Sequence, residues 1–146
     1  MNRKVFLASD HGGFKLKEKL KAWMQEQGTY VVDGGTNSEL SIDYPPLAKN
    51  AANAILKDEV QFAVLICGSG IGMAIAANRV KGIRASVIND PKIAKLTREH
   101  NNANVLCLGG RLTSFYKAKK IVKAFLTTEF SSDEPRYIKR NCMLDE

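Results

Sequence analysis

A cysteine followed by closely spaced glycines is the segment of this chain that most clearly suggests chemistry. Cys67 ends a short apolar run, and Cys67-Gly68-Ser69-Gly70-Ile71-Gly72 leads into small residues typical of a helix. Backbone N–H groups in such a turn can converge on an anion, helped by the helix dipole. The same setting favours the thiolate form of a cysteine. The segment predicts either a reactive thiol beside an anion site or a core cysteine next to glycines needed for turning.

Two imidazoles and several arginines lie in segments that we expect to be loops. His11 follows Asp10 in a glycine-bounded turn, and His100 also has polar neighbours. Histidine transfers protons near neutral pH, and arginine binds phosphate through paired hydrogen bonds. The arginines with this potential are Arg111, Arg136 and Arg140. Together with the thiol they indicate acid–base chemistry on a small phosphorylated metabolite, while the arginines taken alone are more often ordinary solvated surface residues.

Other sequence signatures are incomplete. Position 73 is Met where a tyrosine-phosphatase loop needs Arg, and position 70 is Gly where a redox Cys-x-x-Cys motif needs Cys. The glycine spacing after Cys67 is Gly-x-Gly-x-Gly, whereas the dinucleotide fingerprint is Gly-x-Gly-x-x-Gly after the first strand. Three widely spaced cysteines form neither a disulfide framework nor a zinc knuckle. We therefore expect no metal and no cofactor.

The hydrophobic pattern alternates between strand-like and helix-like segments. Strands are expected at 4–8, 30–32, 62–66, 84–88 and 105–108, and helices at 15–26, 45–57, 73–79, 91–99 and 113–126, before a polar, weakly patterned tail. Short apolar strands that each precede a helix predict a parallel sheet with right-handed crossovers. The predicted fold is α/β: a Rossmann-like three-layer sandwich with a five-stranded parallel sheet, helices on both faces and a C-terminal tail or helix.

Ligands of such sheets bind beyond the carboxyl ends of the strands. The segments that begin at Asp10, Asp43, Cys67 and Gly109 all follow predicted strands, so they should meet at that edge. His100-Asn101 instead directly precedes the fifth strand, at the opposite end of the sheet. Within one chain these two residues do not fit the site, and a neighbouring subunit or a long approach would be needed to bring them there.

Length and composition narrow the function classes further. The 146 residues predict a single domain over 1–146, with 45% hydrophobic and 25% charged residues as in ordinary globular proteins. The longest apolar run, Phe62–Cys67, is far shorter than the ~20 residues that cross a bilayer, and no signal peptide is apparent. The net charge of +7 comes from scattered lysines that are not interleaved with aromatic residues. We expect a cytoplasmic protein with an anionic small-molecule substrate and neither a nucleic acid nor a membrane as partner.

Several motifs in register closely resemble the type B ribose-5-phosphate isomerases, within the wider ribose, galactose and allose phosphate isomerase family. The resemblance runs from Lys4 to about Arg140. The motifs are Ala8-Ser9-Asp10-His11-Gly12-Gly13, Asp43-Tyr44-Pro45, Ile66 to Gly72 with Ala76-Ala77-Asn78, His100-Asn101 with Asn104-Val105, and Gly109-Gly110-Arg111.

This resemblance implies an aldose–ketose isomerase that interconverts D-ribose 5-phosphate and D-ribulose 5-phosphate through an enediolate. Cys67 would be the general base between C1 and C2, since Met73 stands where some family members carry a glutamate. Ser69 would hydrogen-bond the thiolate, and the amides of Gly68 to Gly72 would hold the developing oxyanion. His100 would open the sugar ring.

The resemblance also implies a binding site and an assembly. Asp10 and Asn101 would position hydroxyl groups, and the phosphate would be bound by His11, Arg111, Arg136 and Arg140. Other substrate contacts are expected from Tyr44, Gly68, Ser69, Gly70, Ile71 and Gly72. A homodimer with shared active sites, or a tetramer, would bring His100 to the site of a neighbouring chain. The alternatives are another sugar phosphate (allose 6-phosphate, galactose 6-phosphate or a tetrose phosphate) and a non-catalytic phosphosugar-binding module, which would not need the thiol.

Overall fold

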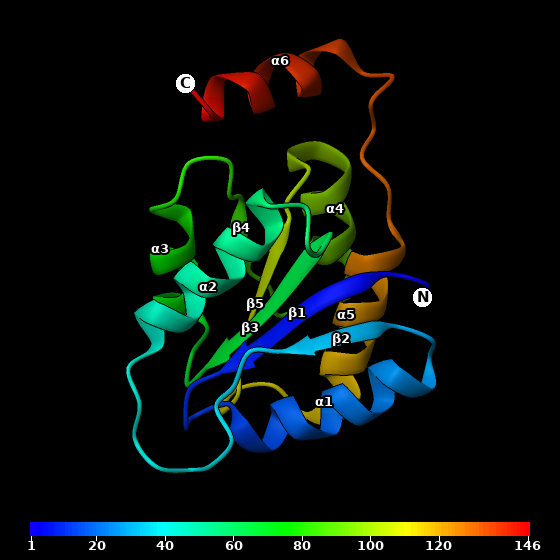
Figure 1. Ribbon diagram of the computed structural model, residues 1–146. Helices are drawn as coiled ribbons and strands as arrows, with labels where there is room; N and C mark the ends of the chain where they lie inside the picture. The colour runs from blue at the N-terminus through cyan, green and yellow to red at the C-terminus, as the bar shows by residue number, and fades with distance from the viewer.

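A parallel sheet of five strands runs through the centre of the computed structural model, which describes all residues 1–146 (Figure 1). In spatial order the strands are β2 (Tyr30–Asp33), β1 (Lys4–Ser9), β3 (Phe62–Cys67), β5 (Val105–Gly109) and β4 (Ala85–Val87). Ser9 of β1 pairs with Ile66 of β3, and Cys67 of β3 pairs with Gly109 of β5. The strand order reverses between β1 and β3, which is where α/β sheets of this type bind ligands.

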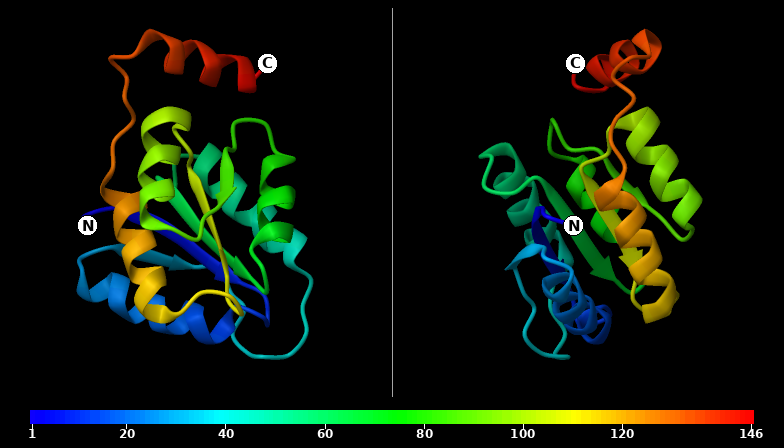
Figure 2. Two further views of the ribbon diagram at one scale, coloured as in Figure 1. Left: turned by 180° about the vertical axis from the view of Figure 1, so that it is seen from behind. Right: turned by 90° about the vertical axis from the view of Figure 1, so that its right-hand side faces the viewer.

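Helices cover both faces of the sheet, as the two views in Figure 2 show. One core cluster joins the sheet to α1 (Phe14–Glu26), α4 (Pro91–Asn101) and α5 (Phe115–Thr127). The other joins it to α2 (Tyr44–Leu56) and α3 (Ile71–Asn78). The sixth helix, α6 (Pro135–Leu144), packs on α4. No helix combines the length and the apolar character needed to cross a membrane.

The buried strand β3 shows why the sheet forms and how it orients the thiol. All six of its residues are buried, because helices pack on both faces. Val64 and Ile66 belong to the cluster with α1 and α5, whereas Leu65 and Cys67 belong to the cluster with α2 and α3. Burying one such aliphatic side chain contributes about 1.5–3 kcal/mol. The alternation of side chains along β3 therefore fixes the register and turns Cys67 towards α3.

The predicted three-layer α/β fold is confirmed. Every predicted strand and helix is present, with ends that differ by no more than two residues. Two of the differences concern the candidate site. The C-terminal segment, which lacks a clear pattern in the sequence, forms the helix α6, and α4 continues through Asn101. His100 and Asn101 therefore lie in the last turn of a helix rather than in a loop. Asn102, with φ of +46°, ends that helix.

Candidate active site

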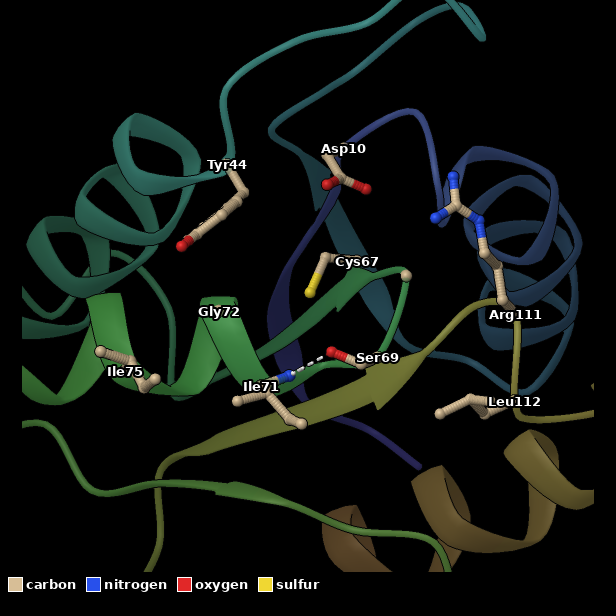
Figure 3. A pocket seen from close by; sticks show the side chains of 10 residues that line it. Asp10, Tyr44, Cys67, Ser69, Ile71, Gly72, Ile75, Arg111 and Leu112 are labelled. Atoms are coloured by element: carbon tan, nitrogen blue, oxygen red, sulfur yellow. Dashed lines mark hydrogen bonds between the residues drawn. The ribbon is translucent and has the colours of Figure 1, made fainter.

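A cavity of about 650 Å³ lies beyond the carboxyl ends of β1, β3 and β5 (Figure 3). It occupies the edge of the sheet at which the sequence placed the chemically useful loops. Its lining residues are Asp10, Tyr44, Cys67, Gly68, Ser69, Ile71, Gly72, Ile75, Arg111 and Leu112. Most of the residues expected around a substrate are thus brought together by a single chain.

Cys67 lines this cavity, among the other side chains drawn in Figure 3, and its thiol is held by the turn that follows it. The backbone N–H of Gly70 donates a hydrogen bond to Cys67 Sγ over 3.2 Å. Gly70 has φ of +82°, and a Cβ atom there would lie 2.9 Å from the carbonyl carbon of Leu108, so only glycine fits. The N–H groups of Gly68, Ser69 and Gly72 donate to no acceptor within the chain. They are available to an anion next to the sulfur.

Ser69 differs from the expectation that its hydroxyl bonds to the thiol. Its Oγ accepts a hydrogen bond from the N–H of Ile71 over 3.2 Å, drawn as the dashed line in Figure 3. A serine two residues before a backbone N–H commonly closes such a turn, and here it starts α3. In this structure the hydrogen bond to sulfur comes from Gly70.

Asp10 and Tyr44 form the side of the cavity next to β1 and α2. Asp10 is buried, and its Oδ1 accepts a hydrogen bond from the N–H of Gly12 over 2.8 Å. Tyr44 is the first residue of α2, which follows Asp43 at the N-cap position. A Cβ atom at Gly72 would lie 2.6 Å from Tyr44 Cζ, so the tyrosine ring packs directly on the start of α3. Both side chains border the space next to the thiol (Figure 3).

A positive charge flanks the cavity on the side opposite to Tyr44 (Figure 3). Arg111, in the loop after β5, is exposed, and its Nη1 would lie 3.1 Å from a Cβ atom at Gly68. His11 does not line the cavity. Its Nδ1 accepts a hydrogen bond from the N–H of Ile42, which ties the loop after β1 to the loop before α2.

His100 and Asn101 lie at the opposite end of the sheet from Cys67, together with the two C-terminal arginines. Cys67 pairs with the last residue of β5, whereas His100 precedes the first. The five residues of β5 separate the two ends by roughly 15 Å. Arg136 and Arg140 are exposed on α6, which Figure 1 shows beside the end of α4 and far from the loop that precedes α2. One chain therefore does not unite all the expected site residues.

Two lining residues were not predicted from the sequence. Ile75 is 61% exposed and Leu112 is 77% exposed, and both border the cavity beside Ile71. Neither carries a polar group that would mark it as functional. The i, i+4 spacing of Ile71 and Ile75 along one helix face is a signal that could have placed Ile75 beside Ile71. These exposed apolar side chains form a rim around a polar site.

The residues whose pKa values are clearly shifted lie outside the cavity. Burial alone would raise the pKa of Asp33, but hydrogen bonds from Lys17 and Lys21 and from the N–H of Gly35 outweigh it and lower the pKa to about 2. Burial, reinforced by the nearby Cys67, raises the pKa of the Cys107 thiol far above its usual range. No three side chains of the His, Cys, Asp and Glu types are grouped to hold a metal ion.

Comparison with known proteins connects this geometry to a protein family. Residues 5–144 match the family model described as Ribose/Galactose Isomerase. The chain is 43% identical over 128 residues to ribose-5-phosphate isomerase B of Escherichia coli, which covers 88% of this chain and 86% of that protein.

Solved structures agree with the sequence match. The ribose 5-phosphate isomerase of Thermotoga maritima superposes with a TM-score of 0.96 at 46% identity and covers 99% of both chains. The ribose-5-phosphate isomerase B of Clostridium thermocellum superposes with a TM-score of 0.94 at 38% identity, over 97% of this chain and 95% of that one. Fold and sequence therefore point to the same group of proteins.

Proposed function

Because the chain belongs to the ribose/galactose isomerase family, we propose that it interconverts D-ribose 5-phosphate and D-ribulose 5-phosphate. Family membership makes it a sugar-phosphate aldose–ketose isomerase. The identity of the sugar is the finer step, and it is supported by the relatives in E. coli and T. maritima that are named for ribose 5-phosphate.

The observation that carries the proposal is the setting of Cys67. Cys67 lines the cavity, its Sγ accepts a hydrogen bond from the N–H of Gly70, and the turn that follows it carries further N–H groups that have no acceptor within the chain. As a thiolate, Cys67 removes the proton from C2 of the open-chain aldose and returns it to C1, while the hydroxyl proton of O2 is transferred to O1, which leaves C2=O. The charge that develops on the enediolate oxygen meets the N–H groups of the turn, which need no reorganisation to stabilise it. Asp10 lines the same cavity and would orient a sugar hydroxyl.

The second half of the proposed site comes from a second copy of the chain. His100 and Asn101 lie roughly 15 Å from the cavity, at the other end of the sheet. A two-fold homodimer that sets this end of one chain against the cavity of the other would supply His100 for ring opening and Arg136 and Arg140 for the phosphate. The exposed rim of Ile71, Ile75 and Leu112 supports this arrangement, because a partner chain would bury it.

Steady-state kinetics with several sugar phosphates tests the proposal. Ribose 5-phosphate should have the highest kcat/KM, compared with allose 6-phosphate, galactose 6-phosphate and a tetrose phosphate in the same assay. A preference for a six-carbon substrate would assign the chain to a sister activity of the family. Binding of the phosphates without any turnover would indicate a phosphosugar-binding module instead.

A further inference from the structure

The imidazole of His100 rests against an aromatic ring of the C-terminal helix. The ring centroids of His100 and Tyr137 lie 4.6 Å apart, with 31° between the ring planes. This separation is that of an offset aromatic contact, and both side chains are half-buried. The ring nitrogens of His100 have no hydrogen-bond partner within the chain. The contact therefore restrains the ring through its face and leaves both nitrogens free.

A buried asparagine fixes the backbone on either side of this contact. Asn141 lies one turn after Tyr137 on α6, and its Nδ2 donates to the carbonyl oxygens of both His100, at 3.0 Å, and Tyr137, at 2.8 Å. The N–H of Ser131 donates to the carbonyl of Glu99, next to His100. Two hydrogen bonds thus tie the end of α4 to α6 and to the segment before it, around the His100–Tyr137 pair.

Tyr137 also contacts an arginine that we assign to the phosphate. The guanidinium carbon of Arg136 lies 5.1 Å from the centroid of the Tyr137 ring, and its Nη2 donates to the Tyr137 hydroxyl over 3.4 Å. One aromatic side chain therefore touches both the imidazole and a guanidinium group. In a sugar phosphate these two groups would act at opposite ends of the same molecule.

We infer that Tyr137 is a positioning residue for ring opening: its ring holds the His100 imidazole in the orientation that meets the furanose. This inference rests on the proposed function, in which His100 opens the ring of the substrate. Tyr137 touches no reacting atom and acts through the face of the His100 ring.

The chemistry of the two substrates separates ring opening from isomerisation. In the furanose form of ribose 5-phosphate, opening removes the proton of the C1 hydroxyl, forms C1=O and breaks the C1–O4 bond, and O4 takes up a proton. Ribulose 5-phosphate carries its phosphate on O5, so it cannot close a five-membered ring and enters the site as an open chain. Exchange of its C1 proton with D₂O reports on enediolate formation and does not require the ring-opening step.

The experiment compares Tyr137→Ala, Tyr137→Leu and Tyr137→Phe with the unmodified enzyme in both assays. Tyr137→Ala and Tyr137→Leu should convert ribose 5-phosphate with a kcat/KM about tenfold lower, the loss expected from an aromatic contact of this kind. Their exchange of the ribulose 5-phosphate C1 proton should stay within about twofold of the unmodified enzyme. Tyr137→Phe keeps the ring and should restore conversion. Lys139→Ala, an exposed change on the same helix, is the matched control and should alter neither assay.

Each outcome bears on one of the two claims. Normal conversion by both Tyr137→Ala and Tyr137→Leu, or an equal loss of conversion and exchange, would overturn the positioning role. The double variant with His100→Ala should show no loss beyond that of His100→Ala alone, because Tyr137 acts only through that ring. If His100→Ala itself converts ribose 5-phosphate normally, the ring-opening assignment fails and the inference falls with it. Melting curves and the mass of the assembly show whether Tyr137→Ala or Tyr137→Leu has merely lost its structure. If one of them has, the other is used to test the positioning role.

Discussion

The backbone N–H of Gly70 donates to the Sγ atom of Cys67 across 3.2 Å. The bond forms because Gly70 adopts φ of +82°, which turns its N–H back towards the end of β3. A donor fixed in this way stabilises negative charge on the sulfur without moving when that charge forms. A conformational property of one glycine is therefore coupled to the chemistry that we propose for the cysteine.

Replacing the cysteine tests this chemistry directly. Cys67→Ala should lower turnover of ribose 5-phosphate by at least about 100-fold, the lower end for a positioned acid–base group. Binding of a phosphorylated substrate analogue should change little, since the phosphate is bound by other residues. Steady-state kinetics and calorimetric titration measure the two effects separately. Turnover within tenfold of the unmodified enzyme would end the thiolate mechanism and direct attention to Asp10.

The other two cysteines provide controls for chemical modification. Cys142 is exposed on α6, so it would react with iodoacetamide for reasons unrelated to the site. Cys107 is fully buried in β5, where burial raises the pKa of its thiol, so it should not react. In a Cys142→Ser background, iodoacetamide should therefore inactivate the enzyme with one thiol modified, and substrate should slow the reaction. Inactivation without modification of Cys67 would contradict this expectation.

Gly70→Ala should weaken both stability and activity. The added methyl group would occupy a left-handed conformation and approach the carbonyl carbon of Leu108 to 2.9 Å, so the turn must shift. We expect a loss of about 1–3 kcal/mol in the free energy of unfolding and a further fall in turnover, because the N–H moves away from Cys67. Urea denaturation and kinetics measure these two effects.

Gly28 offers a matched control for this substitution. It has φ of +86°, but a Cβ atom there meets nothing within 4 Å, and it follows α1 at a distance from the cavity. Gly28→Ala should therefore show the conformational cost alone, with unchanged kcat in the folded enzyme. Equal losses of kcat in the two variants would mean that the Gly70 N–H has no special role at the sulfur.

The residues that lie at the strand ends beside the cavity could be predicted from the sequence, because the strands follow from the hydrophobic pattern. Short apolar runs identify β3 and β5, and parallel strands must place Cys67 and Arg111 at one edge of the sheet. The same rule put His100 at the opposite edge, which the structure bears out. The direction of the strands decides at which edge of the sheet a loop lies, so this prediction stays correct when the predicted strand ends are wrong by one or two residues.

The surroundings of His100 could not be predicted in the same way. α6 is a polar helix with a single buried residue, Asn141, so the sequence carries little of the periodicity that reveals a helix against a core. Its contacts with α4 are specific pairs, such as Tyr137 with His100, rather than a hydrophobic stripe. Pairs of this kind depend on how two helices meet, which no local pattern encodes.

An ion cluster at the end of β2 should make stability depend on acid pH. Lys17 is fully buried and its Nζ lies 2.8 Å from Asp33 Oδ1, while Lys21 Nζ lies 2.8 Å from Asp33 Oδ2. Despite the opposing effect of burial, hydrogen bonds from these lysines lower the pKa of Asp33 from 3.8 to about 2. The carboxylate therefore stabilises the folded state above about pH 4, and this contribution is lost as the pH falls through 2.

Asp33→Asn should destabilise the protein at pH 7 and leave it nearly unaffected at pH 2. After allowance for solvent screening of this partly exposed group, we expect a loss of about 1 kcal/mol in the free energy of unfolding at neutral pH. Urea denaturation at pH 7, 4 and 2 measures the difference. Asp133→Asn, at an exposed carboxylate, is the control and should track the unmodified protein throughout. A constant difference between Asp33→Asn and the unmodified protein at all three pH values would refute the linkage.

Turnover should need no metal ion. The proposed steps assign the base to Cys67 and the stabilisation of charge to backbone N–H groups, so no Lewis acid is required. Extensive treatment with EDTA, followed by dialysis, should leave kcat and KM unchanged. A loss of activity that returns only when a divalent cation is added would show that a metal takes part.

Mixing two inactive variants tests whether the site is shared between chains. Cys67→Ala and His100→Ala each remove one half of the proposed site, and the two residues lie at opposite ends of the sheet in one chain. In a two-fold dimer that contains one chain of each kind, one site lacks both residues and the other retains both. Random exchange of subunits should therefore restore about a quarter of the unmodified activity. Native mass spectrometry establishes that mixed dimers have formed. If mixed dimers are present and remain fully inactive, Cys67 and His100 do not meet across a subunit interface.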